Sequence, residues 1–525
     1  MFRWCARRDP FPLLNCARMP TNAGQTPDLQ RRPHAIVIGS GFGGLAAAVR
    51  LGARGYRVTV LEQLDAAGGR AYVFRQDGFT FDAGPTIITA PFMLEDLWQL
   101  CGRRLSDDVQ LKALHPFYRI RFNDGEMLDC SADEAQMAAQ INRFAPDDLA
   151  GYNAFLKVSE AIYEVAFERL AHLPFNSITD MLRLVPDLVR LRSYRSIYGL
   201  VASFVKDPRL RFALSFHPLF VGGNPFTTTS IYGLIAFLER RWGVHFAVGG
   251  TGSIVEGLLG LIRAQGNAVR FGARVAQITL QGRRANGVQL NTGETLPADI
   301  VVSNADAAAT YRDLLPAAVR RRWTDRKLAR AQYSMSLFVW YFGTSRQFTE
   351  VPHHTILVGP RYRELIRDIF ERKVLADDFS LYLHRPSATD PSLAPPGCDA
   401  FYVLSPVPHL QADTDWTQRA ESYRRSIAEF LQRTLLPGLS DCVVSSRIMT
   451  PLDFRDRLLS VNGAAFGLEP LLMQSAWFRP HNRSEDIEHL YMVGAGTHPG
   501  AGLPGVLSSA RVLDTVVPDV SAFVR

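Results

Sequence analysis

The stretch AIVIGSGFGGLAAAVRL, from Ala35 to Leu51, decides the fold of this 525-residue chain. A short apolar run is followed by a glycine-rich turn and then by an alanine-rich helical pattern, which predicts strand, turn and helix in that order. Gly39, Gly41 and Gly44 form GxGxxG directly after the strand. Missing side chains let this backbone approach a bulky ligand, and free N–H groups at the helix start bind a pyrophosphate.

A second apolar strand, RVTVLEQ, follows the helix and contains Glu62 near its end. An acidic side chain at this distance from the glycines hydrogen-bonds a ribose hydroxyl in dinucleotide-binding folds. By itself the glycine pattern is also compatible with an ordinary tight turn. The strand, helix and acidic residue together favour a dinucleotide site.

A second loop, AGGRA, comes immediately after this unit and contains Gly69 and Arg70. One interpretation makes it an ordinary loop with a surface charge at Arg70. The other uses the glycines for close approach and the guanidinium for a bidentate phosphate contact, and its position after Glu62 favours it. An extended dinucleotide with a second contact loop favours FAD over NAD.

The segment LYMVGAGTHPGAGLPGVLSSA, from Leu490 to Ala510, repeats the order strand, glycine turn and helix near the far end of the chain. The two segments lie far apart in sequence. Both contribute to one cofactor site only if the fold brings them together, which is what we expect.

Composition excludes several classes of protein. The net charge of +7 is modest for this length and forms no dense basic stripe beside aromatic residues, so we expect no nucleic-acid partner. No apolar run is long enough to span a membrane. The six cysteines are scattered without metal-ligand spacing, which predicts reduced thiols in a cytosolic protein and no metal site.

We expect an α/β protein with a Rossmann-like FAD-binding domain, a mixed-sheet substrate domain and a helical insertion. The FAD-binding domain is predicted to be discontinuous and to comprise residues 34–130, 243–330 and 483–525. The helical region is predicted to comprise residues 131–242, and the substrate-binding sheet domain residues 331–482. Residues 1–33 read as a disordered tail or an over-long gene start, which leaves Met1 and Met19 as alternative initiators.

The helical region contains long helical patterns, one of which runs through Met181–Val205. Apolar residues surround most of this predicted helix and are interrupted mainly by arginines. A helix lying on a bilayer has this composition, and so has a core helix whose arginines extend to water. Both interpretations stay open.

The chain resembles the bacterial-type phytoene desaturases, which belong to the wider amine oxidase superfamily of flavoproteins with the GR2-type fold. The likeness covers essentially the whole chain after the tail. It is carried by the segments GSGFGGLAAAVRL, GGRAYV, GFTFDAGPT, LFVGGNPFTTTSIYGLI, RRWGVHFAVGGTGSIVEGL, SNADAAATYRDLL and QSAWFRPHNR, and by the C-terminal glycine-rich segment. The resemblance implies FAD as cofactor and successive desaturation of 15-cis-phytoene, an apolar C40 polyene, to neurosporene and/or lycopene.

The resemblance also implies roles for individual positions. The pyrophosphate would contact Gly39, Gly41 and Gly44, and the adenosine ribose would contact Glu62. The GGR loop, with Gly69 and Arg70, would contact the phosphate or the flavin side of the cofactor. The adenine would contact the backbone of Val275, and the ribityl phosphate would contact Gly494. The flavin pyrimidine ring would lie against Gly505 and Val506 at the start of the last helix.

Desaturation needs few acid and base groups, and no Ser/His/Asp pattern or paired carboxylate motif is present. By resemblance, Asp180 and Arg183 are candidates for acid–base or positioning work. The alternative is an aspartate that stabilises a helix N-terminus, with an arginine one turn later. His498 is either a base or a residue that holds its loop through a backbone bond.

Other functions remain open from the sequence. The alternatives within the same class are a C30 diapophytoene desaturase, a methoxyneurosporene-type desaturase and a carotene isomerase. The alternative from a different class is a non-catalytic prenyl-binding escort protein. We expect a cytoplasmic protein that associates peripherally with the inner membrane, with a quinone or oxygen as the electron acceptor.

Overall fold

A five-stranded parallel sheet carries the glycine-rich turns in the computed structural model, which describes residues 32–523. Its strands, in spatial order, are β19 (Leu490–Met492), β13 (Ile300–Ser303), β1 (His34–Ile38), β2 (Arg57–Leu61) and β9 (Ala268–Arg270). The first and the last strand of this sheet in sequence are therefore separated only by β13. All four pairings are parallel, so the carboxyl ends of the strands meet at one edge.

Alternating side chains bury both faces of this sheet. Ala35 and Val37 point toward one core, while Ile36 and Ile38 point toward another. The first face packs against α1 (Phe42–Ala53), α2 (Pro91–Gln99), α9 (Thr251–Ala264) and α15 (Leu503–Val516). The second packs against α10 (Ala307–Leu314), α11 (Asp325–Arg330) and a small antiparallel sheet of β10 (Val275–Gln281), β11 (Arg284–Leu290) and β12 (Thr295–Pro297).

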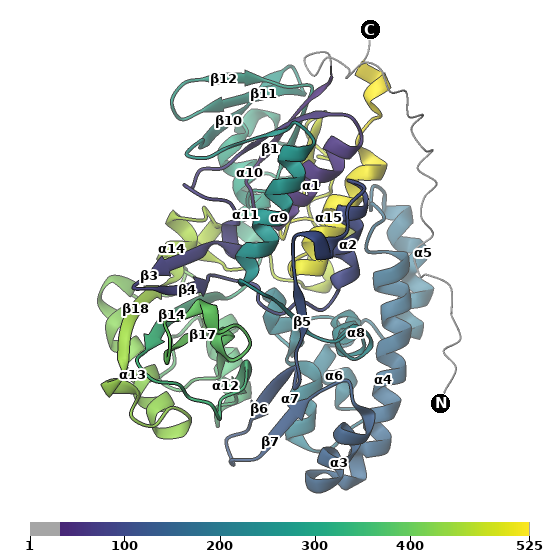
Figure 1. Ribbon diagram of the computed structural model, residues 1–525. Helices are drawn as coiled ribbons and strands as arrows, with labels where there is room; N and C mark the ends of the chain where they lie inside the picture. The colour runs from purple at the N-terminus through teal and green to yellow at the C-terminus, as the bar shows by residue number, and fades with distance from the viewer. Residues whose placement is uncertain (1–31, 524–525) are drawn as a thin grey trace.

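A seven-stranded mixed sheet forms the second half of the molecule (Figure 1). Its order is β18 (Val443–Met449), β14 (Ser336–Thr344), β17 (Asp399–Val407), β16 (Leu381–His384), β15 (His354–Leu357), β6 (Tyr118–Arg121) and β7 (Met127–Cys130). The helix α13 (Trp416–Thr434) packs on one face, and α12 (Tyr362–Arg367) and α14 (Pro451–Asp456) lie against the other. Two further antiparallel pairs are the hairpin of β3 (Val73–Gln76) with β4 (Phe79–Asp82) and the long-range pair of β5 (Leu111–Ala113) with β8 (His245–Ala247).

The domain boundary predicted at residue 130 differs from this sheet. The hairpin of β6 and β7 was expected in the FAD-binding domain, but β6 pairs with β15 and extends the substrate-side sheet. Pairing between strands more than 200 residues apart leaves no local signal in the sequence. The segment on either side of Ala273 likewise forms two strands, β9 and β10, which belong to different sheets.

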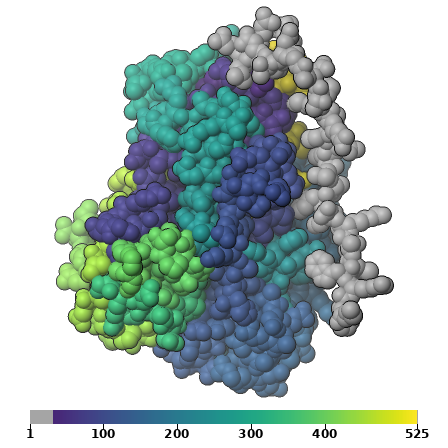
Figure 2. All heavy atoms as spheres, in the orientation of Figure 1, coloured from purple at the N-terminus to yellow at the C-terminus, as the bar shows by residue number. Residues whose placement is uncertain are grey.

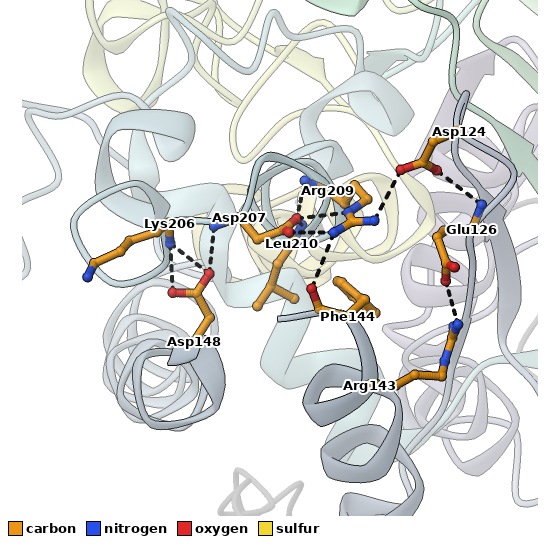
Figure 3. Close-up of polar contacts among 9 residues, drawn as sticks. All are labelled: Asp124, Glu126, Arg143, Phe144, Asp148, Lys206, Asp207, Arg209 and Leu210. Carbon is orange, nitrogen blue, oxygen red and sulfur yellow. Dashed lines mark hydrogen bonds and ion pairs between the residues drawn. The ribbon is translucent and has the colours of Figure 1, made fainter. Parts of the chain in front are cut away.

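The helical region forms the base of the molecule in Figures 1 and 2. It consists of α3 (Glu134–Phe144), α4 (Leu149–Tyr163), α5 (Ile178–Arg190), α6 (Ile197–Val201), α7 (Pro208–Ser215) and α8 (Leu234–Trp242). A polar network ties α3, α4 and α7 together (Figure 3). The Asp148 carboxylate accepts the backbone N–H groups of Lys206 and Asp207, and Arg209 donates to Asp207, Asp124 and the Phe144 carbonyl.

The single long helix predicted through Met181–Val205 is wrong. The chain forms α5, leaves helical geometry after Arg190, and resumes as α6 at Ile197. Arg192 has a φ of 54°, and the Ser193 carbonyl accepts the Thr229 hydroxyl at 2.6 Å instead of continuing the helix. A tertiary contact therefore sets this break. Among residues 32–523, no helix is long and apolar enough to cross a membrane.

The predicted N-terminal tail lies almost wholly outside the described residues, as does the choice between Met1 and Met19. Cys101, Cys130, Cys398 and Cys442 are all free thiols.

Candidate functional site

One cavity of about 1180 Å³ extends from the glycine-rich turns of the five-stranded sheet to the seven-stranded sheet. Gly41, Arg70 and Gly494 line its first end, while Phe216 and Leu404 line the second. Its volume exceeds that of an ordinary small-molecule pocket, which ranges up to about 1,000 Å³. The cavity is large enough for two ligands that meet end to end.

The first glycine turn has no room for side chains. A Cβ atom on Gly44 would overlap the carbonyl oxygen of Gly39, and one on Gly41 would lie 3.0 Å from the Asn304 amide nitrogen. Gly41 also precedes the first residue of α1 and lines the cavity, so the N-terminus of this helix faces the cavity. Such a helix end offers unpaired backbone N–H groups to an anion.

The C-terminal glycine turn meets the first one directly, as expected. A Cβ on Gly43 would lie 2.9 Å from the Cα of Gly494, and a Cβ on Gly505 would lie 2.5 Å from the Gly500 carbonyl oxygen. Gly494, Gly505 and Val506 all line the cavity, and α15 begins there. These close approaches between backbones, with two helix N-termini at one cavity, fit the predicted dinucleotide.

Glu62 lies at the end of β2 beside the cavity and is buried. Its carboxylate accepts the Ser40 backbone N–H at 2.8 Å, the Ser40 hydroxyl at 2.6 Å and the Leu64 N–H at 2.9 Å. These bonds fix the carboxylate against the glycine turn. Contact with a ribose stays a prediction.

Arg70 lies at the cavity wall and is not the surface charge of the simpler interpretation. It follows Gly69 in the short 3-10 helix Gly69–Ala71 and donates to the Ala465 carbonyl at 2.6 Å and the Ser460 hydroxyl at 3.0 Å. Burial lowers its pKa, and the nearby Asp306 carboxylate opposes that shift. Its guanidinium therefore joins the loop after β2 to the segment that precedes the C-terminal strand.

Val275 opens β10 and lines the cavity, where it pairs with Leu290. This position is compatible with the predicted adenine contact, which stays a prediction.

The structure does not bring Asp180 and Arg183 to the cavity. Asp180 forms a capping box with Ser177 at the start of α5, and hydrogen bonds from Ser177 lower the pKa of its carboxyl. Arg183 is exposed and lies 3.7 Å from the same carboxylate. This geometry corresponds to the helix N-terminus alternative. On the same helix, Leu184 and Leu188 do line the cavity.

His498 lines the cavity within the C-terminal glycine turn. Its Nε2 lies 3.4 Å from the Leu170 carbonyl, its ring packs edge-on against Phe175, and burial lowers its pKa to about 4. These contacts hold the turn against the helical region. Of the two predicted roles, they correspond to that of a residue that holds its loop.

Sequence reasoning missed the side chain that fills the space between the two glycine turns. Asn304 follows β13 and lies near the Cβ positions of Gly41, Gly43 and Gly494. Asp306, two residues on, caps α10 through the N–H groups of Ala308 and Ala309. A polar segment directly after a buried parallel strand was the available signal, because ligands bind at the carboxyl ends of such strands.

A polar cluster in the seven-stranded sheet was also missed. Thr86, Tyr382 and Tyr402 line the cavity and share hydrogen bonds, and Tyr382 contacts the buried His354. These residues come from three separate segments, and no motif connects them. The sequence predicted no metal site, yet His353, His354 and His384 form one buried cluster.

The cavity can therefore hold a dinucleotide at one end and an apolar chain at the other. Aromatic and aliphatic side chains dominate the second end, and Thr86, Tyr382 and Tyr402 form a hydrogen-bonded group of hydroxyls there. An arrangement of this kind suits a reaction in which the cofactor performs the difficult step.

Comparison with known proteins agrees with this geometry. Residues 42–512 match the model of the flavin-containing amine oxidoreductase family. A phytoene desaturase (neurosporene-forming) of Rhodobacter capsulatus is 48% identical over 92% of this chain and 94% of its own. A phytoene desaturase (lycopene-forming) of Pseudescherichia vulneris is 52% identical over 91% and 97%.

Solved structures show the same fold at much lower identity. An oxidoreductase from Methanosarcina mazei matches with a TM-score of 0.60 at 19% identity, over 92% of this chain and 100% of that one. A putrescine oxidase variant matches with a TM-score of 0.64 at 14% identity, over 94% and 99%.

Proposed function

The chain belongs to the flavin-containing amine oxidoreductase family, and on this premise we propose that it is an FAD-dependent phytoene desaturase. It introduces successive double bonds into 15-cis-phytoene and yields neurosporene, lycopene or both. The observation that carries this proposal is the continuous cavity, with a glycine-lined dinucleotide end and an apolar end against the seven-stranded sheet.

FAD is the cofactor of this family, and the close approach of the two glycine turns fits it. Gly39, Gly41 and Gly44 would hold the pyrophosphate at the start of α1, and Glu62 the ribose. Gly505 and Val506, at the start of α15, would face the flavin. Bound FAD accepts the two electrons that leave the substrate with each new double bond.

The apolar end of the cavity binds and orients the polyene. Phe212, Phe216 and Phe220 line it from the helical region, and Leu337 and Leu404 from the sheet. An apolar chain gains about 25 cal/mol per Å² of surface removed from water here. The same side chains exclude water from the reacting carbons.

Helix α5 supplies the membrane contact in this proposal. None of its residues is buried, and Leu182 and Val189 each expose 60% of their surface. Arg183 and Arg190 lie on the same helix and suit anionic headgroups. Because Leu184 and Leu188 line the cavity, this helix is also the place where an apolar substrate would pass between bilayer and cavity.

The experiment uses the full-length FAD-loaded protein with phytoene in liposomes, under anaerobic conditions, with a quinone added or oxygen readmitted. Formation of coloured carotenes identified by chromatography supports the proposal, and their identity gives the number of desaturation steps. Unchanged colourless phytoene with both acceptors would overturn it. Turnover with only one of the acceptors would identify the terminal oxidant.

A C30 desaturase is one of the alternatives within the class, beside a methoxyneurosporene-type desaturase and a carotene isomerase. A 4,4'-diapophytoene desaturase of a Methylomonas species is 31% identical, well below the phytoene desaturases. Faster turnover of diapophytoene than of phytoene would favour that alternative.

A further inference from the structure

Three hydrogen-bonded hydroxyl groups form a polar ridge on the mostly apolar wall at the second end of the cavity. The Thr86 Oγ1 lies 2.8 Å from the Tyr402 hydroxyl and 3.1 Å from the Tyr382 hydroxyl, and all three residues line the cavity. Hydroxyl groups on an apolar wall cost free energy unless they are paired, so their mutual hydrogen bonds hold the ridge in place.

Tyr382 connects this ridge to buried imidazoles behind it. Its hydroxyl lies 2.7 Å from the Nδ1 of His354, and that same Nδ1 lies 3.2 Å from the Nδ1 of His384. His354 and His384 are directly opposite each other in the pairing of β15 with β16, and Tyr382 lies two residues before His384 on the same face. The strand register therefore dictates this row of side chains.

The Nδ1 of His354 has two partners and, when neutral, only one hydrogen or one lone pair to share between them. A nitrogen within hydrogen-bond distance of a hydroxyl and of a second imidazole is a natural point of proton transfer. Burial lowers the pKa values of His354 and His384 well below the ordinary value. Both rings are therefore neutral in the resting protein, and a proton that either one takes up is readily passed on.

The row continues toward the surface through His353. Its ring centroid lies 4.4 Å from that of His354 and 4.8 Å from that of His384, and its Nδ1 lies 2.6 Å from the hydroxyl of the partly exposed Thr389. The Nε2 atoms of all three imidazoles have no hydrogen-bond partner within the described part of the chain. One ring nitrogen of each of the three imidazoles lies within 4.8 Å of the others, so the proton has a short path between the rings.

We propose that Tyr382 and His354 receive the proton that leaves the substrate, and that His384 and His353 pass it toward Thr389. This inference rests on the proposed function, because each new double bond releases one hydrogen with its electron pair and one as a proton. Bound FAD would accept the hydrogen that leaves with its electron pair. For the second, the carbon–hydrogen bond breaks and its electrons become the π bond. The tyrosine oxygen gains that proton while its own passes to His354 Nδ1.

The same three histidines could also ligate a metal ion, and the surroundings favour the relay. The Nδ1 atoms of His353 and His354 already contact hydroxyls, and no carboxylate belongs to the cluster of described residues.

The test compares Tyr382→Phe and His354→Gln with wild-type protein loaded with FAD, under single turnover of liposomal phytoene in H2O and D2O. His409→Gln is the matched control, because His409 is another buried histidine but contacts Lys373 and does not line the cavity. We expect the desaturation rate to fall by about 100-fold in both relay variants. FAD content and melting temperature should match the wild type, and the control rate should stay within twofold.

Three further readouts separate a relay from a structural role. The wild-type rate should be lower in D2O, and this dependence should disappear in Tyr382→Phe. Added imidazole should partly restore His354→Gly. Purified protein should contain no stoichiometric metal.

Active wild-type protein with equally active variants would overturn the relay, as would a metal lost together with His354. Wild-type protein that leaves phytoene unchanged would instead overturn the proposed function. Should His354→Gln lose its FAD or fold poorly, Tyr382→Phe decides, since it removes a single oxygen atom.

Discussion

The two sheets of this molecule build their ends of the cavity in opposite ways. The five-stranded sheet presents backbone, with glycines so close together that Gly43 and Gly494 nearly touch. The seven-stranded sheet presents side chains, with hydroxyls and imidazoles brought together by strand register. The first end therefore offers groups that every residue possesses, and the second offers side chains that strand pairing brings together.

The strongest test of the backbone end is Gly44→Ala. The added methyl group would overlap the Gly39 carbonyl oxygen, and we expect at least about 3 kcal/mol of destabilisation together with loss of FAD. Urea unfolding and FAD absorbance per chain measure both. Gly260→Ala is the control, because this helical glycine has nothing within 4 Å of its Cβ position and should gain up to about 1 kcal/mol. Equal behaviour of the two variants would contradict the contrast between the sheets.

Arg70 tests the contact that the backbone end makes with the rest of the chain. Arg70→Lys cannot reproduce both the bond to the Ala465 carbonyl and the bond to the Ser460 hydroxyl. The loss of one charge-assisted hydrogen bond should cost about 2 kcal/mol in urea unfolding. Arg75→Lys, at an exposed position nearby, should change nothing measurable. If Arg70→Lys also left the free energy of unfolding unchanged, Arg70 would contribute only its charge, which lysine retains.

The side-chain end should respond to acid. Burial lowers the pKa of His409 to about 4, so the unfolded chain takes up the proton first as pH falls below about 6.5. Stability from this group is complete above pH 6.5 and decreases between there and pH 4, by about 1.4 kcal/mol at pH 5.5. Denaturant unfolding of wild type and His409→Gln at pH 7.5 and 5.5 measures the difference.

Comparing the pH dependence of the unfolding free energy in wild type and His409→Gln separates His409 from groups whose titration has the opposite effect on stability. Burial raises the pKa of Glu469 to about 7, so this carboxyl favours the folded state at low pH. The two proteins share Glu469, and its contribution cancels between them. Identical pH dependence of wild type and His409→Gln would show that His409 titrates normally.

Helix α5 belongs to neither sheet and should have the smallest effect on stability. Leu182→Ser combined with Val189→Ser removes exposed side chains, and unfolding should change by no more than about 0.5 kcal/mol. Binding to anionic vesicles in a sedimentation assay should nevertheless weaken by at least about tenfold. Val444→Ser, on an exposed part of β18, is the control. Unchanged vesicle binding would place the membrane contact elsewhere.

The sequence predicted the backbone end well and the side-chain end poorly. Both glycine turns and the strands and helices beside them are where the patterns placed them, because a nucleotide-binding unit is encoded in adjacent residues. The break between α5 and α6 and the addition of β6 and β7 to the second sheet depend on Thr229 and on β15, which are distant in sequence. For the same reason Tyr382 and His354 could not be identified before their strands were paired.

The position of Asn304 makes the glycines around it interdependent. Its amide group lies within 3.0 Å of the Cβ positions of Gly41, Gly43 and Gly494, so one side chain occupies space left by residues from both ends of the chain. A methyl group added at Gly43 or Gly494 would collide with this amide, and shortening Asn304 would reduce the collision. Double-mutant cycles should therefore be strongly non-additive. At Gly43 the added methyl group would still lie 2.9 Å from the Cα of Gly494, so a change at Asn304 relieves only part of the crowding there.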